Sequence, residues 1–256
     1  MHPYLAEFVG TTLLVLLGNG VVCNVVLAKT KGHESGWIVI TAGWGIAVFI
    51  GALSSSQFSG AHLNPALSFA MWIAEKLPAG DLFGYVCAQM LGGTAGALLC
   101  YLFYRQHFHA TPGGDEKLAC FCTGPNLRGA WQALFCEALG TFTLVLPIFL
   151  MVAPSLQWPS GQTEALPTPI LGLGTLGLVP VGLLVFGIGL SLGGTTGYAI
   201  NPARDLAPRL VHALLPIPGK RDSQWSYALV PVIGPLLGAG LAGLVFKILI
   251  QQGGGP

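Results

Sequence analysis

The chain has 256 residues, of which 53% are hydrophobic and only 8% are charged, against about 25% charged in an average soluble domain. With a mean hydropathy of +0.69 and 37 glycines, this composition is typical of a protein with several membrane-spanning helices. The net charge of +1 excludes a strongly basic nucleic-acid surface, so we expect the lipid bilayer, and no nucleic acid, as a partner.

The apolar segments predict the order of membrane spans. The first has no Lys or Arg ahead of it and is interrupted by Glu7, so it does not resemble a cleaved signal peptide. Because about 20 apolar residues can cross a bilayer, we predict spans at 3–28, 36–55, 80–104, 130–153, 172–193 and 225–250. The expected connections are 29–35, 105–129, 154–170 and 217–224.

Two further apolar segments, 64–74 and 201–215, are too short to cross a bilayer. Both begin with the tripeptide Asn-Pro-Ala, as Asn64-Pro65-Ala66 and Asn201-Pro202-Ala203. Asn is a preferred helix N-cap and Pro is favoured at the first helical position, so each tripeptide predicts a helix start. Paired interruptions of this kind point to a translocation site. We therefore predict two half-helices.

The chain also contains an internal repeat. Residues 7–17 read EFVGTTLLVLL and residues 137–147 read EALGTFTLVLP, with six of eleven positions identical. Glu7 precedes its tripeptide by 57 residues and Glu137 by 64, and we expect the extra seven within 154–170. Since each repeat holds three full spans, the second must enter the membrane from the opposite side. We predict a single channel domain, 1–256, built from inverted repeats at about 3–104 and 130–250.

The twin tripeptides, Ala6-Glu7-Phe8, the stretch Ser59-Gly60-Ala61-His62-Leu63 and Arg204 together resemble the aquaporin superfamily over nearly the whole chain. Asp205 after Arg204 resembles the glycerol-facilitator branch, the aquaglyceroporins. The resemblance implies an all-α membrane protein, an aquaporin-like bundle of six transmembrane helices with two re-entrant half-helices. It also implies one pore per chain, a homotetramer and a multi-pass protein of the plasma membrane.

The resemblance places Asn64, Pro65 and Ala66 and Asn201, Pro202 and Ala203 at the pore centre. The two amides would then donate to a passing oxygen, while the positive ends of both half-helix dipoles repel cations. Simple N-capping is the alternative for each Asn taken alone.

By spacing and resemblance, the selectivity filter consists of Trp44, Gly189, Tyr198 and Arg204. Insertion of an Arg into an apolar part of a membrane protein costs about 2.5 kcal/mol or more, and such residues usually serve function. The alternative for Arg204 is an interfacial side chain that snorkels to the lipid headgroups. The alternative for Trp44 and Tyr198 is ordinary packing. Gly189 is expected to leave the opening wide. Glycerol facilitators commonly have Phe where this chain has Tyr198. We therefore expect the Tyr198 hydroxyl either to add a hydrogen-bonding group to the apolar corner between the two aromatic rings or to narrow that corner. We expect Tyr198→Phe to shift the ranking of polyols.

Four residues are expected to support the pore. Glu7 and Glu137 are predicted to accept hydrogen bonds from the irregular backbone before each half-helix, with a proton relay as the alternative. Asp205 is expected to be a structural carboxylate, with solute binding as the alternative. The resemblance gives His62 a backbone carbonyl in the lumen and leaves its ring incidental.

These features predict a passive channel for glycerol and other small uncharged solutes, namely water, dihydroxyacetone, urea or a neutral organic acid, that excludes ions and protons. A proton-coupled secondary transporter is the alternative, because inverted repeats and broken helices occur there too; a scaffold protein would not need Arg204 beside twin half-helices. The chain has no nucleotide loop or catalytic grouping, and Cys120 and Cys122 have a poor spacing for zinc. We expect no enzyme activity, no metal and no cofactor.

The orientation has conflicting signals. The positive-inside rule would make Lys29, Lys31, Arg105, Lys117 and Arg128 cytoplasmic. The resemblance instead puts those loops outside and both termini in the cytoplasm, and we adopt this second orientation.

Overall fold

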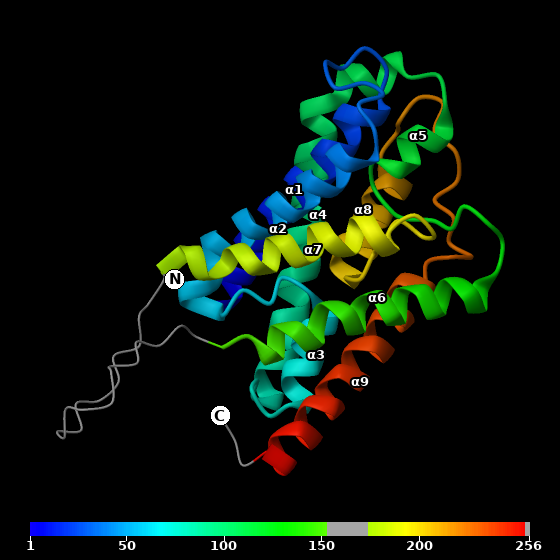
Figure 1. Cartoon of the computed structure of the whole chain (residues 1–256). Coiled ribbons are helices and arrows are strands. Elements are labelled where there is room, and N and C mark those ends of the chain that lie inside the picture. Colours follow the sequence, from blue (N-terminus) through cyan, green and yellow to red (C-terminus); the bar gives the residue numbers. More distant parts are fainter. Residues whose placement is uncertain (153–173, 254–256) are drawn as a thin grey trace, which may run out of the picture.

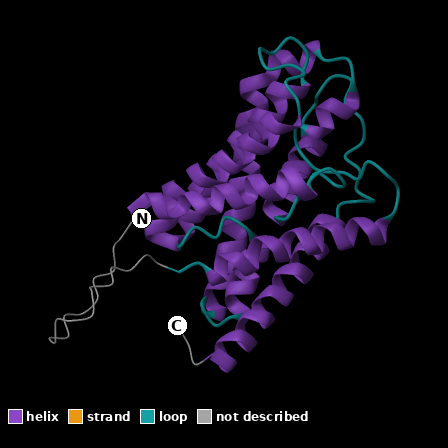
Figure 2. Cartoon of the chain, in the orientation of Figure 1, coloured by secondary structure: helices purple, strands orange, loops and turns teal. Residues whose placement is uncertain are grey.

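The computed structural model describes residues 1–152 and 174–253, and the regular structure in this part of the chain is entirely helical (Figures 1 and 2). In chain order the elements are α1 (Pro3–Val26), α2 (Trp37–Ser59), α3 (Pro65–Ile73), α4 (Ala79–Ala110), α5 (Gly114–Ala119), α6 (Ala130–Leu150), the 3-10 helix η1 (Gly174–Leu178), α7 (Val179–Leu192), α8 (Pro202–Leu214) and α9 (Val230–Gly253). Within the described ranges, six helical stretches are long and apolar enough to cross a membrane. They match the six predicted spans, and α3 and α8 are the predicted half-helices.

Several boundaries differ from the sequence prediction: α2 continues to Ser59, past the expected end at 55, and α9 begins at Val230, after the expected start at 225. Helix α4 continues to Ala110, past the expected end at 104, because Phe108 is buried and packs against Phe121 with ring centroids 5.6 Å apart. The expected loop 105–129 contains the short helix α5, whose Lys117 is buried and donates to the carbonyl of Pro218 at 2.5 Å. The connection 154–170 lies outside the described residues.

The helices form two groups that mirror the inverted repeat. In the first repeat α1 packs on both α2 and α4, and in the second α6 packs on α9. Each half-helix lies against the last span of the other repeat, α3 on α9 and α8 on α4. Figure 1 shows α6 and α9 together on one side and α1, α2 and α4 on the other. Helix α7 packs mainly on α2 and joins the two groups.

Glycines permit the closest helix contacts in each repeat. A Cβ atom on Gly92 of α4 would lie 2.5 Å from the carbonyl oxygen of Phe8 on α1. A Cβ atom on Gly234 of α9 would lie 2.7 Å from the Cβ of Glu137 on α6. Both positions therefore require glycine, and the small-residue spacing brings the last span of each repeat against the first.

Lys220 holds the C-terminal end of α8. Its ammonium donates to the carbonyls of His212 at 2.5 Å, Ala213 at 2.8 Å and Leu215 at 2.7 Å. A cation is favourable at this end of a helix because the last carbonyls lack intrahelical donors, although burial lowers the pKa of Lys220. The half-helix that carries Arg204 is thus fixed at its far end.

Candidate functional site

The loops that lead into α3 and α8 have the same unusual backbone. Ala61 and Leu63 have φ angles of 55° and 51°, and Tyr198 and Ile200 have φ angles of 39° and 43°. These left-handed residues occupy equivalent places before the two Asn-Pro-Ala tripeptides. A non-glycine residue held in this region costs on the order of 1–3 kcal/mol, so the surrounding structure must impose it.

Glu7 of α1 holds the first loop. One carboxylate oxygen accepts from the backbone N–H of His62 at 2.9 Å and the hydroxyl of Ser59 at 2.6 Å. The other accepts from the N–H of Leu63 at 2.6 Å and from Gln89 of α4 at 2.8 Å. Four donors converge on one fully buried carboxylate, so the predicted acceptor arrangement is present.

Glu137 of α6 performs the same task in the second loop. Its two carboxylate oxygens accept from the N–H groups of Ala199 at 3.0 Å and Ile200 at 2.8 Å. The side chain is fully buried, like that of Glu7. The inverted repeat therefore uses two symmetry-related acids to bind N–H groups that have no helical partner.

Asn64 and Asn201 are the N-caps of the half-helices. The Asn64 carbonyl oxygen accepts from the N–H of Ala66 at 2.9 Å. The Asn201 oxygen accepts from the N–H groups of Ala203 at 2.9 Å and Arg204 at 3.3 Å. In both cases Pro follows at the first helical position, as the sequence predicts.

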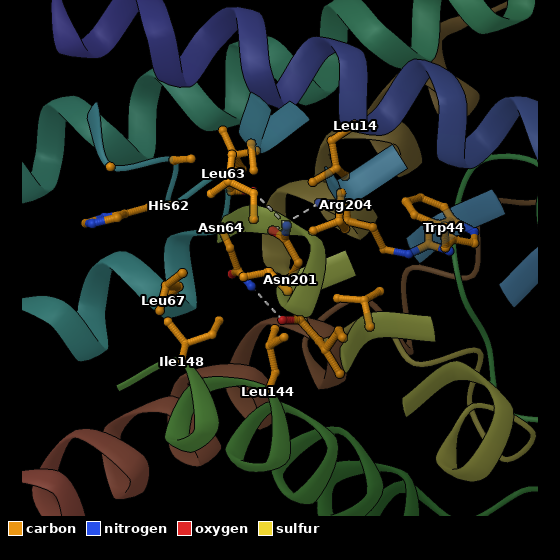
Figure 3. Close-up of a pocket in the computed structure, with 18 of the residues that line it drawn as sticks. Leu14, Trp44, His62, Leu63, Asn64, Leu67, Leu144, Ile148, Asn201 and Arg204 are labelled. Carbon is orange, nitrogen blue, oxygen red and sulfur yellow. Dashed lines mark hydrogen bonds between the residues drawn. The ribbon is translucent and has the colours of Figure 1, made fainter. Parts of the chain in front are cut away.

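The same two side chains join the half-helices end to end. The Asn64 amide donates to the carbonyl of Ile200 at 2.8 Å, and the Asn201 amide donates to the carbonyl of Leu63 at 2.8 Å. Figure 3 shows the two amides meeting at the centre of the site. Since a carboxamide carries two N–H groups, each Asn retains a second donor, and both residues line the cavity described next.

A central cavity of about 120 Å³ surrounds this meeting point. Apolar side chains from spans of both repeats line it, including Leu14, Val48, Leu144 and Val185. The two irregular loops and their Asn residues, from 60–64 and 198–201, also line the cavity. The cavity lining therefore combines apolar side chains with a smaller number of hydrogen-bonding groups.

A second cavity of about 510 Å³, here called the vestibule, lies on the side of α5. It is bounded by α1, α2 and the segments 119–126 and 193–198. Trp44, Tyr198 and Arg204 line both the vestibule and the central cavity. These three residues are therefore shared by the two cavities, and the place where they lie is here called the constriction.

Arg204 lies at the constriction, and its charge has no acceptor among the described residues. Its guanidinium carbon lies 3.9 Å from the centre of the Trp44 ring, and Figure 3 shows the side chain reaching toward Trp44. Within the described residues, the guanidinium makes no hydrogen bond or ion pair, although the residue is only 6% exposed. Its N–H groups are therefore available to a molecule in the constriction.

Gly189 has a different place from the one expected. It is not among the residues that line either cavity. A Cβ atom there would lie 2.9 Å from Cζ of Tyr198 and 3.0 Å from its hydroxyl oxygen. Gly189 therefore makes room for the Tyr198 ring and does not itself widen the opening. The Tyr198 hydroxyl is buried and has no hydrogen-bond partner in the described part of the chain.

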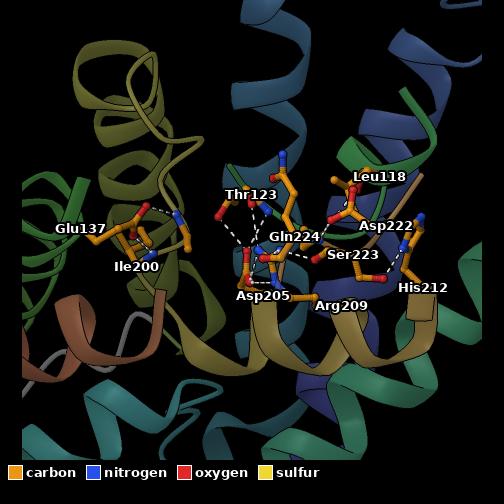
Figure 4. A network of polar contacts seen from close by, with 12 residues as sticks. Leu118, Thr123, Glu137, Ile200, Asp205, Arg209, His212, Asp222, Ser223 and Gln224 are labelled. Atoms are coloured by element: carbon orange, nitrogen blue, oxygen red, sulfur yellow. Dashed lines mark hydrogen bonds and ion pairs between the residues drawn. The ribbon is translucent and has the colours of Figure 1, made fainter. Parts of the chain in front are cut away.

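Asp205 lies in a buried polar network behind the constriction (Figure 4). One oxygen accepts from the N–H and the hydroxyl of Thr123, both at 2.7 Å, and the other accepts twice from Arg209, at 2.8 and 2.9 Å. Arg209 also donates to the carbonyls of Thr123, Ser223 and Gln224. Asp205 thus binds the loop of Thr123 to α8, Arg209 binds the loop of Ser223 and Gln224, and Asp205 does not line either cavity.

The sequence analysis does not include two contributors to the site, Arg209 and Gln89, and it does not expect a role for the ring of His62. Arg209 follows Asp205 by four residues, a spacing that permits a helical ion pair and was the available signal. Gln89 is a polar residue within a predicted span, where such residues usually have a partner; it binds Glu7 and the hydroxyl of Ser68. The ring of His62 also contacts Ser68, at 3.0 Å, and the residue lines the central cavity.

The fold and this site define a membrane pore protein in which two half-helices meet between inverted repeats. The family model described as "Major intrinsic protein" matches residues 1–246, and the chain belongs to this family. It is 49% identical to a probable glycerol uptake facilitator protein of Thermotoga maritima (97% of this chain, 100% of the relative) and 48% identical to the glycerol uptake facilitator protein of Streptococcus pneumoniae (97% and 99%).

A comparison with a solved structure supports the same family and fold. The chain aligns with the aquaglyceroporin from Plasmodium falciparum with a TM-score of 0.80 and 30% identity, over 97% of this chain and 96% of that one. The aquaporin-like fold inferred from the sequence is therefore confirmed. The chain is therefore a multi-pass membrane protein of this family, and the relatives named here are glycerol uptake facilitators and an aquaglyceroporin.

Proposed function

We propose that Trp44, Tyr198 and Arg204 form the selectivity filter, with Gly189 as the residue that seats Tyr198. The observation that carries the proposal is that these three side chains line both cavities while the Arg204 guanidinium has no acceptor among the described residues. A polyol hydroxyl in the constriction accepts from Arg204, and its carbon chain packs on the two aromatic rings.

The central cavity supports the passage of small neutral molecules with polar and apolar sides. Helix side chains such as Leu14 and Val185 offer carbon surface, and the loops before α3 and α8 offer polar backbone. We propose that glycerol, water, dihydroxyacetone, urea and neutral small organic acids pass, because each can present oxygen or nitrogen to the polar lining groups without bringing a charge.

Asn64 and Asn201, with Pro65, Ala66, Pro202 and Ala203, are proposed to form the pore centre that excludes ions. Both half-helices direct their N-terminal, positive ends to this point. The second N–H of each amide donates to a passing oxygen, and the protein offers no carboxylate in the cavity lining to compensate a cation. A permeating cation would therefore lose hydration without gaining a counter-charge.

The test is permeation into proteoliposomes, with protein-free vesicles as the control. We expect osmotic swelling in glycerol, dihydroxyacetone and urea that follows the solute gradient, together with slower water flow and no ion current. Arg204→Leu should reduce the preference for glycerol over water, whereas Trp72→Leu, a change on α3 outside both cavity linings, should not. Fast water flow with exclusion of glycerol would contradict the proposed filter.

The proton-coupled transporter is the competing function for the two buried acids. Its signature would be uptake that requires a proton or sodium gradient. Glu7 and Glu137 each bind backbone N–H groups with both carboxylate oxygens, which is a structural use of the charge. We therefore propose that flux is independent of any ion gradient, that the chain has no catalytic activity, and that it requires no cofactor.

We further propose that residues 1–256 act as one channel domain, that four chains assemble and that both termini face the cytoplasm. A cross-linking experiment in mild detergent that yields monomers alone would contradict the tetramer.

The orientation needs a probe in the loop between α4 and α6. Cys120 and Cys122 are too buried to report on this loop, so a cysteine introduced at the exposed Arg128 is the better probe. Labelling of Arg128→Cys by an impermeant reagent in intact cells is the expected result, and protection there would reverse the orientation.

A further inference from the structure

Trp37 lies at the edge of the vestibule, outside the residues predicted for the filter. It is the first residue of α2 and follows Gly36, whose φ of 97° turns the chain into the helix. Its side chain is 41% exposed and lines the vestibule together with Trp44 and Tyr198. The indole therefore lies on the route to the constriction, but it does not line the central cavity.

The indole N–H connects two helices behind the constriction. Nε1 of Trp37 donates to the carbonyl oxygen of Gly189 on α7 at 3.0 Å. Gly189 is the residue whose missing side chain makes room for Tyr198. The hydrogen bond thus fixes the backbone against which the Tyr198 ring rests.

The indole ring also contacts Tyr198 directly. The two ring centroids lie 5.9 Å apart at an interplanar angle of 81°, an edge-to-face arrangement that is favourable for aromatic pairs. Gly193 completes the enclosure, because a Cβ atom there would overlap Cδ1 of Tyr198 and lie 2.9 Å from Cζ2 of Trp37. The phenol ring is therefore held in a slot between Trp37 and two glycines.

From this geometry we infer that Trp37 is a positioning residue for solute selection, acting through Tyr198. The inference rests on the proposed filter, in which the place of the Tyr198 ring sets the shape of the opening. When Trp37 is replaced, the Tyr198 ring gains freedom to turn toward the vestibule, so the width of the constriction varies with the orientation of that ring. The effect concerns discrimination between solutes of different size, such as water, glycerol and the four-carbon polyol erythritol.

The experiment compares permeability ratios in proteoliposomes, because a ratio does not depend on the amount of folded channel. Trp37→Phe removes the hydrogen bond and keeps a ring, and Trp37→Ala removes both. Loss of one hydrogen bond predicts a change of roughly two- to twelvefold in the glycerol-to-water or glycerol-to-erythritol ratio for Trp37→Phe, and at least as large a change for Trp37→Ala. Trp72→Phe is the matched control, since Trp72 is 40% exposed and lies outside both cavity linings.

A double-mutant cycle shows whether Trp37 acts through Tyr198. In a Tyr198→Ala background, Trp37→Phe is expected to leave both ratios unchanged. Wild-type ratios in folded Trp37→Ala, or the same shift in both backgrounds, would overturn the inference; if Trp37→Ala does not fold, Trp37→Phe decides alone. A wild-type channel that fails to prefer glycerol would instead contradict the proposed filter, so the two failures are distinguishable.

Discussion

The guanidinium of Arg204 lies over the indole ring of Trp44, with its central carbon 3.9 Å from the ring centre. The N–H groups of the guanidinium have no hydrogen-bond partner among the described residues, so they are available to a solute. The aromatic residue thus supports the charge and at the same time limits the width of the constriction.

We predict that Trp44→Ala widens the channel and weakens its discrimination. The change removes one wall of the constriction and a cation–π contact of about 0.5–2 kcal/mol. Permeability to erythritol and five-carbon polyols should rise several-fold relative to glycerol, measured by vesicle swelling. Trp72→Ala should leave these ratios as in the wild type, and an unchanged cut-off in Trp44→Ala would mean that another residue limits the pore.

A small substitution on α7 tests the slot for Tyr198. In Gly189→Ala the new Cβ atom would lie 2.9 Å from both Cζ of Tyr198 and Cγ2 of Thr41, and overpacking of this kind costs about 1–3 kcal/mol. Because the ring can move only toward the opening, we expect glycerol flux to fall about fivefold or more, with a smaller effect on water.

The same substitution two residues earlier is the control. A Cβ atom on Gly187 would meet nothing within 4 Å, so Gly187→Ala should have wild-type flux. Equal flux in both variants would show that Gly189 has no part in seating Tyr198.

Tyr198→Phe is predicted to have little effect on selection. The hydroxyl oxygen is buried and has no partner among the described residues, so its removal deletes an unsatisfied polar group and no solute contact. The glycerol-to-water ratio should change less than twofold, and the thermal unfolding midpoint in detergent should stay the same or rise. A several-fold change in the ratio would show that the hydroxyl does reach the solute.

The case of Tyr198 illustrates where sequence reasoning fails for this chain. The spans, the half-helices and the acids that bind their loops follow from apolar length, the Asn-Pro-Ala tripeptide and the internal repeat, which are local signals. The direction of the Tyr198 hydroxyl depends on Gly189 and Trp37, which come from two other helices. Such three-way packing leaves no local pattern, so the structure was needed to find it.

The buried pair of Asp205 and Arg209 gives a prediction about stability. Both side chains are fully buried, and Arg209 also donates to three backbone carbonyls of the loops beside α8. Removing one partner of such a pair leaves an uncompensated buried charge and costs about 3–5 kcal/mol. Arg209→Met should therefore lower the thermal unfolding midpoint strongly and loosen the segment around Thr123, which lines the vestibule.

Arg221 provides the comparison for Arg209, because it is an arginine on a neighbouring loop that pairs with Asp115 at the surface. The hydrogen bond to Asp115 raises the pKa of Arg221, but its side chain is 38% exposed, and exposed pairs contribute little. Arg221→Met should consequently unfold close to the wild-type temperature. Hydrogen exchange at residues 120–124 should increase in Arg209→Met and stay unchanged in Arg221→Met. If both variants unfold at the wild-type temperature, the network behind the constriction does not stabilise it, and the place of Arg204 must depend on α8 alone.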